Sequence, residues 1–389
     1  MRSKTIKKNF IIPLMAIATF CFFLLMGILV GKLSHRNGIS LIESESSVPF
    51  LMKIVLIYVF SFICWIFQVI IHESGHLIGG LLTGYKFVSF RIFKNCIIKK
   101  DGKFHLKYLK IPGTGGQCLM APPIDYNIKN VPFHVYNLGG VFMNFISFLV
   151  SITLLWNMSF SEPMFILISL NMVFSLFFFL LNIIPFNSTV TNDGYNSVLF
   201  KKNKTERLYF FKIIDINAQL SNGKRFRDID ESLFPVKSVN DNSSSFEIQL
   251  FILFLSYSFD KDFDLDKYCE NVNNIPKNLK NLPGILKNEI DCERLFSLFL
   301  NNGDKEEISS LETKNLKRFI SLTKDCMVNK KRLLYTKALF VDNNPEEAEE
   351  IYNQSIMLEK SYPSEGEYIT ELSFFNKLKK RYAAKAEQL

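Results

Sequence analysis

The sequence predicts an all-α multi-pass membrane domain with a small β insertion, followed by a mostly α-helical soluble domain. Three observations predict this fold class. The first 200 of the 389 residues contain four long apolar segments, a basic segment of alternating pattern interrupts them, and the rest of the chain is charged and polar. About 20 apolar residues can cross a bilayer as a helix, and a change of composition along a chain indicates more than one unit.

We expect the membrane spans at residues 9–31, 54–84, 136–156 and 163–186. The first apolar run, from Asn9 to Gly31, contains no charged residue. It is too long for the apolar part of a typical cleavable signal, and no small-residue cleavage site follows it. The chain therefore predicts four spans within a transmembrane domain at residues 1–200.

Basic residues predict how these spans are oriented, because Lys and Arg gather on the cytoplasmic side of a membrane. They gather in the leading tail, in the loop at 86–130 and after the fourth span: Arg2, Lys4, Lys7, Lys8, Lys86, Arg91, Lys94, Lys99, Lys100, Lys103, Lys107, Lys110, Lys129, Lys201, Lys202 and Lys204. Both termini should be cytoplasmic. Topology then explains the net charge of +9, so the expected partner is the lipid bilayer and no nucleic acid is expected. A Lys-, Asn- and Ile-rich composition is typical of a low-GC bacterium, which indicates a bacterial cell membrane.

The loop at 86–130 predicts a small sheet at the cytoplasmic membrane surface. Apolar and polar residues alternate there, so that Phe104, Leu106 and Tyr108 should share one face of a strand. Asp101-Gly102 lies between two such runs and is typical of a hairpin turn. The glycine-rich connection from Pro112 to Gln117 lacks the ending of a phosphate loop. It is either a turn or backbone that approaches a substrate closely.

The remaining chain divides into an expected linker region at 201–245 and a helical cytoplasmic domain at 246–389. Phe251 to Leu255 is too short to span a membrane and predicts a buried helix. Two further helices are expected at Leu333–Phe340 and Pro345–Lys360, with Pro345 in the first turn. This pair resembles a tetratricopeptide-type hairpin, and such a domain would recruit a substrate or partner protein. Seven scattered cysteines without a C-x-x-C pair predict free thiols.

The second span carries the motif H-E-x-x-H as His72-Glu73-Ser74-Gly75-His76. On a helix, residues i and i+4 project from one face, so the two histidines could offer nitrogens to one Zn²⁺ ion. Glu73 lies beside them, where a carboxylate can take a proton from water activated by the metal. His76 lies eight residues before Gly84, about 12 Å along the helix, so the metal would lie inside the membrane near its cytoplasmic side.

A zinc site of this kind needs a third protein ligand, and Asp193 is the candidate. Pro185 should break the fourth span near its cytoplasmic end, which allows the chain after it to return toward the metal. Asp193 could instead cap a cytoplasmic helix. His72 and His76 could also be packed polar residues, although polar groups at this depth usually mark function. His105 and His134 are better explained as surface or interfacial histidines.

Taken together, these motifs resemble the site-2 protease family of intramembrane zinc metalloproteases, in its simple branch without a PDZ domain. The resemblance covers roughly residues 50–200 and rests on the H-E-x-x-H span, on Gly140-Val141-Phe142-Met143-Asn144, and on Asn182-x-x-Pro185 followed by Asp193-Gly194. It implies that His72, His76 and Asp193 ligate zinc and that Glu73 is the catalytic base. It also implies that Asn144 and Asn182 help to position the substrate, unless they only bond between helices.

The sequence thus predicts a zinc metalloendopeptidase that cleaves within or next to a transmembrane segment of its substrate, or in a membrane-associated peptide precursor. The alternative is a non-catalytic metal-binding membrane scaffold or a transporter or export subunit. Glu73 favours the enzyme, because a protein that only binds metal has no need of the base.

Overall fold

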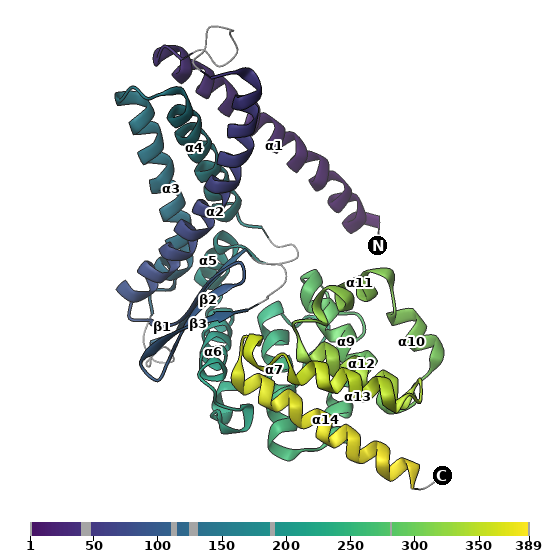
Figure 1. The fold of residues 1–389 in the computed structure, drawn as a ribbon. Helices are drawn as coiled ribbons and strands as arrows, with labels where there is room; N and C mark the ends of the chain where they lie inside the picture. Colours follow the sequence, from purple (N-terminus) through teal and green to yellow (C-terminus); the bar gives the residue numbers. More distant parts are fainter. Residues whose placement is uncertain are drawn as a thin grey trace. The chain divides into compact units, whose positions relative to one another are not determined.

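The computed structural model describes residues 2–39, 48–109, 115–123, 131–186, 191–280 and 282–387, with side chains from Ile17 onward. It divides into two compact units. Unit 1 comprises Met1–His72 and Gly140–Asn182, and unit 2 comprises Glu73–Gly139 and Ile183–Leu389. The boundary passes through one continuous helix, α2 (Phe50–Leu82), which Figure 1 labels. The two histidines of the motif therefore lie on the same helix.

Unit 1 is formed by α1 (Arg2–Arg36), the first part of α2, most of α3 (Phe133–Asn157) and α4 (Glu162–Ile183). All four helices are long and apolar enough to cross a membrane, as the sequence predicts. Large apolar side chains point outward, and Phe20, Tyr58 and Phe62 are more than half exposed. Such an outer surface is unfavourable in water and suits a lipid environment.

The interior of unit 1 combines a small apolar core with buried polar groups. The core contains Met26, Leu33, Leu155, Phe165 and Met172. A buried ion pair joins α2 to α4, since Lys53 Nζ lies 2.6 Å from Glu162 Oε1 and both side chains are 5% exposed. α4 ends at Ile183, just before Pro185, because proline disfavours helical conformation in the preceding residue and supplies no amide donor.

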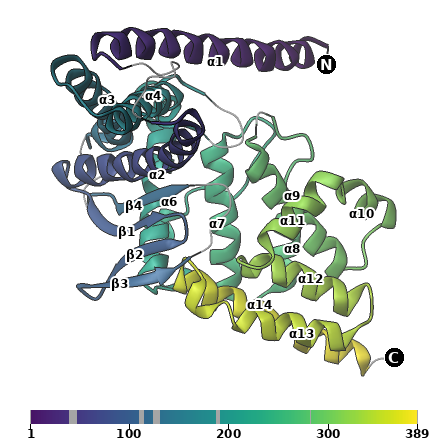
Figure 2. The same ribbon diagram turned by 45° about the horizontal axis from the view of Figure 1, so that its top comes forward.

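Unit 2 begins with a four-stranded antiparallel sheet in the order β3-β2-β1-β4 (Figure 2). The strands are β1 (Lys86–Ile92), β2 (Asn95–Lys100), β3 (Lys103–Tyr108) and β4 (Gly116–Ala121). Asp101 and Gly102 have φ angles of 50° and 77° and form the tight turn between β2 and β3. The predicted hairpin is therefore confirmed, whereas the first half of the connection from Pro112 to Gln117 lies outside the described residues.

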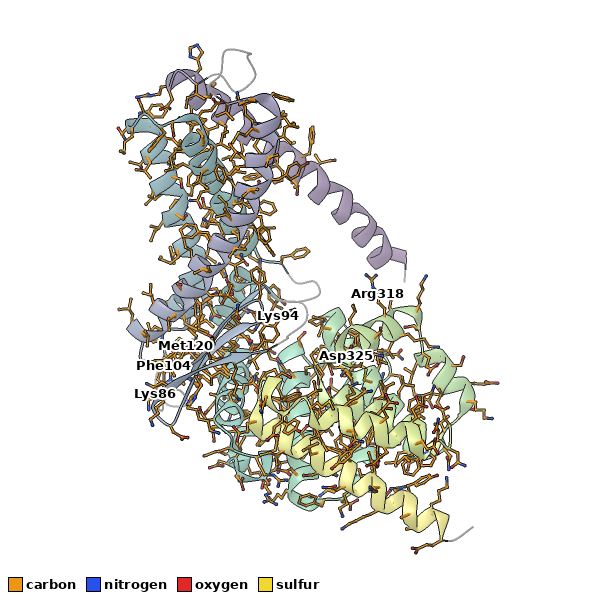
Figure 3. All side chains as sticks on the ribbon, in the orientation of Figure 1. Lys86, Lys94, Phe104, Met120, Arg318 and Asp325 are labelled. Atoms are coloured by element: carbon orange, nitrogen blue, oxygen red, sulfur yellow. The ribbon has the colours of Figure 1, made fainter. Side chains whose placement is uncertain are left out.

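The edge strand β3 exposes its apolar side chains. Phe104, Leu106 and Tyr108 are 67%, 77% and 58% exposed, and Figure 3 labels Phe104 beside the sheet. The edge of the sheet at β3 is not fully open to solvent, however. Lys100 Nζ, at the turn, lies 2.6 Å from Glu365 Oε2 at the start of α14 (Glu365–Ala386), and the strand also contacts the short turn at Glu359–Ser361. Addition of a further strand at this edge would have to displace these contacts.

The rest of unit 2 is helical (Figure 1). Its helices are α5 (Asp193–Lys202), α6 (Lys204–Ser221), α7 (Ser245–Asp262), α8 (Leu265–Asn273), α9 (Gly284–Leu300), α10 (Lys305–Leu311), α11 (Lys314–Thr323), α12 (Val328–Phe340), α13 (Pro345–Ile356) and α14. Phe251 and Leu255 are buried within α7, and Pro345 occupies the first turn of α13, both as predicted. The hairpin α12–α13 is present, whereas the tetratricopeptide assignment stays a prediction.

Residues 201–245 differ from the linker that their polar composition suggested. They contain α6 and two short 3₁₀ turns, Phe226–Asp228 and Glu231–Leu233. Ile213 and Ile216 of α6 are buried in the same core as Met120 of β4. Apolar residues run densely through α6 from Leu208 to Ile216, and this run predicts burial better than the average polarity of the segment does. The sheet and the C-terminal helices therefore share one core.

A buried ionic cluster lies at the centre of these helices. The guanidinium of Arg332 lies 2.8 Å from Glu293 and 3.0 Å from Glu371. It also packs over the rings of Phe296 and Phe374, at 4.4 and 4.1 Å from their centroids. Because a buried charge is costly without partners, loss of either carboxylate should destabilise the helical region strongly.

Candidate metal centre

The motif lies on an uninterrupted stretch of α2. The helix ends at Leu82, and Gly84 follows with a φ of 85°, a conformation that glycine adopts without strain. The amide of Tyr85 donates to the carbonyl of Gly80, which closes the end of the helix. His72 and His76 are therefore one turn apart on one face, and Glu73 is adjacent to the first of them.

His72 is oriented by a side chain. Its Nδ1 lies 2.7 Å from Asn144 Oδ1 on α3. Asn144 Nδ2 is already committed, because it donates to the side-chain oxygen of Gln68 at 2.8 Å and to the Gln68 carbonyl at 3.2 Å. Asn144 therefore presents an acceptor to the ring, so His72 Nδ1 carries the proton and Nε2 is the nitrogen that the ring can offer to an ion.

His76 is oriented by the main chain. Its Nδ1 lies 2.8 Å from the carbonyl oxygen of Tyr136, which can only accept a hydrogen bond. The Nδ1 atom must then donate, and Nε2 is directed to the site. His76 Nε2 lies 3.5 Å from Asp193 Oδ2, and the two side chains are 12% and 19% exposed.

Asp193 opens α5, and the preceding Asn192 holds it in place. Asn192 Oδ1 accepts from the amides of Tyr195 at 2.9 Å and Phe186 at 3.1 Å, while its Nδ2 donates to the carbonyl of Ile184 at 2.6 Å. The Asn192 side chain thus caps α5 and connects it by hydrogen bonds to the residues that follow α4. Part of the path from Pro185 to Asp193, residues 187–190, lies outside the described residues.

The three predicted ligands come together. Potential ligand atoms of His72, His76 and Asp193 all lie within 4.8 Å of one another. Two imidazole nitrogens and one carboxylate oxygen match the donor set of a zinc site that keeps a position open. Both rings also engage their second nitrogen with a protein oxygen, which is the usual support of metal-bound histidines. The residues therefore fit a zinc ion, although the same donors also suit other divalent transition metals.

Two glycines allow the close approach of other groups to the motif. A Cβ atom on Gly116, at the start of β4, would lie 2.6 Å from Cγ and Oε1 of Glu73, whose side chain is largely buried. A Cβ atom on Gly140 would lie 2.7–2.8 Å from three ring atoms of His72. The backbone of β4 thus flanks the expected base, and α3 packs directly on the expected ligand.

The two asparagines implied by the resemblance lie in different surroundings. Asn144 is fully buried, and its bonds go to His72 and Gln68. Asn182, in the last turn of α4, donates from Nδ2 to the carbonyl of Phe178 at 3.0 Å, a bond within its own helix. Sequence reasoning missed Gln68, Tyr136 and Asn192. Of these, Gln68 could have been found, because it is a polar residue within an apolar span, one turn before His72.

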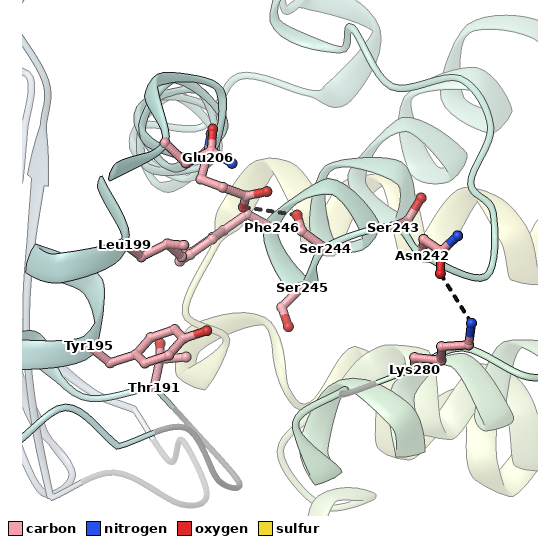
Figure 4. Close-up of a pocket in the computed structure, with 11 residues that line it drawn as sticks. Thr191, Tyr195, Leu199, Glu206, Asn242, Ser243, Ser244, Ser245, Phe246 and Lys280 are labelled. Carbon is pink, nitrogen blue, oxygen red and sulfur yellow. Dashed lines mark hydrogen bonds between the residues drawn. The ribbon is translucent and has the colours of Figure 1, made fainter. Parts of the chain in front are cut away.

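A separate cavity of about 230 Å³ lies beside α5 (Figure 4). Thr191 and Tyr195 line it, and the Ser244 hydroxyl donates there to the Glu206 carboxylate at 2.9 Å. Asp193 does not line it, because residues two positions apart in a helix project from different sides. The cavity is therefore distinct from the candidate metal centre.

Comparisons of the chain with family models, with curated proteins and with solved structures find no match.

Proposed function

We propose that this chain is an integral membrane zinc metalloendopeptidase of the site-2 protease kind, which cleaves a peptide bond within or next to a transmembrane segment, or in a membrane-associated peptide precursor. One observation carries the proposal: two histidines of an apolar, membrane-length helix each turn Nδ1 to a protein oxygen, and their potential ligand atoms gather with those of Asp193. The orientation with both termini in the cytoplasm follows from the distribution of Lys and Arg.

The residues have distinct roles in this proposal. His72, His76 and Asp193 hold the ion. When bound, zinc supplies a Lewis acid that acidifies water and polarises a carbonyl. Glu73 accepts the proton of the attacking water and returns a proton to the leaving amine. The helical region that shares a core with the sheet supplies a surface for substrate or partner protein.

The proposal is tested first by the metal content of the purified full-length chain. We expect about one zinc per chain in the wild type and a large loss in Asp193→Ala, because a carboxylate ligand is removed. Asp228→Ala, an exposed position in the turn after α6, is the matched control and should retain the metal. A wild-type protein that binds no zinc would refute the proposal.

The second test is cleavage of single-span candidate substrates in detergent or vesicles. Glu73→Gln keeps the size of the side chain and removes its basicity, so we expect cleavage to fall by about 10²-fold or more with zinc retained. Equal cleavage by wild type and Glu73→Gln would remove Glu73 as the base. Zinc binding without any cleavage by the wild type would favour the metal-binding scaffold or transporter subunit.

A further inference from the structure

A group of buried polar side chains lies inside unit 1, in the part of α2, α3 and α4 that we place within the membrane. Its members are Gln68, Asn144, Ser147, Ser151 and Asn171. Gln68 and Asn144 are 0% exposed, and Ser151 is 3% exposed. Amides are costly in such surroundings even when paired, so their presence in this packed interior calls for a function.

These side chains form a continuous path of hydrogen bonds that ends at His72. Gln68 Nε2 donates to Asn171 Oδ1 at 2.8 Å and to Ser147 Oγ at 3.0 Å. Asn171 Nδ2 donates to Ser151 Oγ at 2.8 Å and to Ser147 Oγ at 3.2 Å, and the Ser151 hydroxyl donates to the Ser147 carbonyl at 2.8 Å. Together with the bonds from Asn144 to Gln68, the path connects three helices.

The bonds to Gln68 fix the direction of the Asn144 amide. If the Asn144 amide were turned over, its Oδ1 would face the carbonyl and side-chain oxygens of Gln68, and a carbonyl oxygen cannot donate. Turning Gln68 as well would place its oxygen against Asn171 Oδ1. The main-chain carbonyl and the side-chain oxygen of Gln68 thus fix the Asn144 amide, which presents its oxygen to His72.

We propose that Gln68 is a positioning residue that acts through Asn144 to hold His72 in the tautomer with its proton on Nδ1. Nε2 of His72 is then available to the metal without a prior exchange of protons. Asn144 serves as the orienting partner of a ligand, in place of the contact with substrate that the family resemblance suggests. This inference rests on the proposed function, because it needs the site to bind a metal.

The test is zinc affinity of the full-length chain in detergent, measured by competition with a chromogenic chelator. Gln68→Leu removes the side-chain oxygen that accepts from Asn144 Nδ2 at 2.8 Å and leaves the 3.2 Å bond to the main-chain carbonyl, so zinc should bind about 10- to 100-fold more weakly, as for other supports of metal ligands. Gln68→Glu should bind zinc at least tenfold more tightly than Gln68→Leu, because its buried carboxyl in the neutral form keeps an acceptor toward Asn144 and a donor toward Asn171. A purely structural role for Gln68 predicts no such recovery.

Ser175→Ala is the matched control, because Ser175 is also 0% exposed and bonds only locally to the Met172 carbonyl. It should bind zinc as the wild type does. If Gln68→Leu does not fold, Asn171→Ala tests the path from its far end and should lower affinity several-fold. Unchanged affinity in a folded Gln68→Leu or Asn171→Ala, or no tighter binding by Gln68→Glu than by Gln68→Leu, overturns the inference alone. A wild type without zinc affinity overturns the proposed function with it.

Discussion

Gly140→Ala should weaken the metal site without altering any ligand. The new Cβ would lie 2.7–2.8 Å from Cε1, Nδ1 and Nε2 of His72, whereas ordinary contacts begin near 3.4 Å. The ring must therefore shift by roughly 0.7 Å, and it cannot do so without straining its 2.7 Å bond to Asn144. Metal–ligand distances tolerate only about 0.2 Å, so we expect zinc to bind about 10- to 100-fold more weakly, or about 1.4–2.8 kcal/mol.

The assay is chelator competition on the purified protein, with thermal unfolding in detergent as the check on folding. Gly31→Ala is the matched control, since a Cβ atom there meets nothing within 4 Å. Both substitutions replace a glycine within a membrane-length helix, so they share the gain in helix propensity. Wild-type zinc affinity in Gly140→Ala would refute the close approach of α3 to His72 on which the reasoning depends.

Three further predictions concern other supports of the site and the helical region. Gly116→Ala should displace the Glu73 carboxylate, because the new Cβ would lie 2.6 Å from it, and we expect cleavage to fall at least tenfold with zinc retained. A parallel loss of zinc would contradict an effect on the base alone. Asn192→Ala removes the cap of α5 and the hydrogen bond to the Ile184 carbonyl, which should cost about 1 kcal/mol of stability and reduce zinc affinity. Asn203→Ala, which removes the cap of α6, should cost similar stability and leave zinc affinity unchanged. Burial raises the pKa of Glu367 to about 7, so its contribution favours the folded state below its ordinary pKa and is lost as the pH rises through 7. Glu367→Gln should therefore raise the melting temperature at pH 8 and flatten the dependence of the melting temperature on pH, with the exposed Glu346→Gln as control. If Glu367→Gln and the wild type show the same dependence on pH, burial of Glu367 is not its cause.

Local patterns in the sequence predicted most of the fold. The spans follow from runs of apolar residues, and the turn at Asp101-Gly102 follows from residues that tolerate positive φ. Residues 201–245 are folded where a linker is expected, because α6 carries a dense apolar run from Leu208 to Ile216 and even its charged Glu206 and Lys212 are buried. Overall polarity is a poorer guide to folding than local runs of apolar residues.

The candidate site was predictable in its ligands and not in its supports. H-E-x-x-H fixes two ligands by helical spacing alone, and a proline that ends a span indicates where the third returns. By contrast, the partners of the histidines come from other helices. No spacing within α2 pairs Gln68 with Asn171, 103 positions away, or predicts that the Tyr136 carbonyl meets His76.

The two histidines should also respond differently to substitution. His76 is held by a main-chain carbonyl, so Tyr136→Phe leaves its bond intact and removes only the hydroxyl that donates to the Cys118 carbonyl at 3.0 Å. His72 is held by an amide side chain whose direction depends on the side chain and the main-chain carbonyl of Gln68. Side-chain substitutions can therefore disturb the tautomer of His72 far more readily than that of His76. We therefore expect the proposed metal centre to be most sensitive to substitutions in the buried hydrogen-bonded path of unit 1.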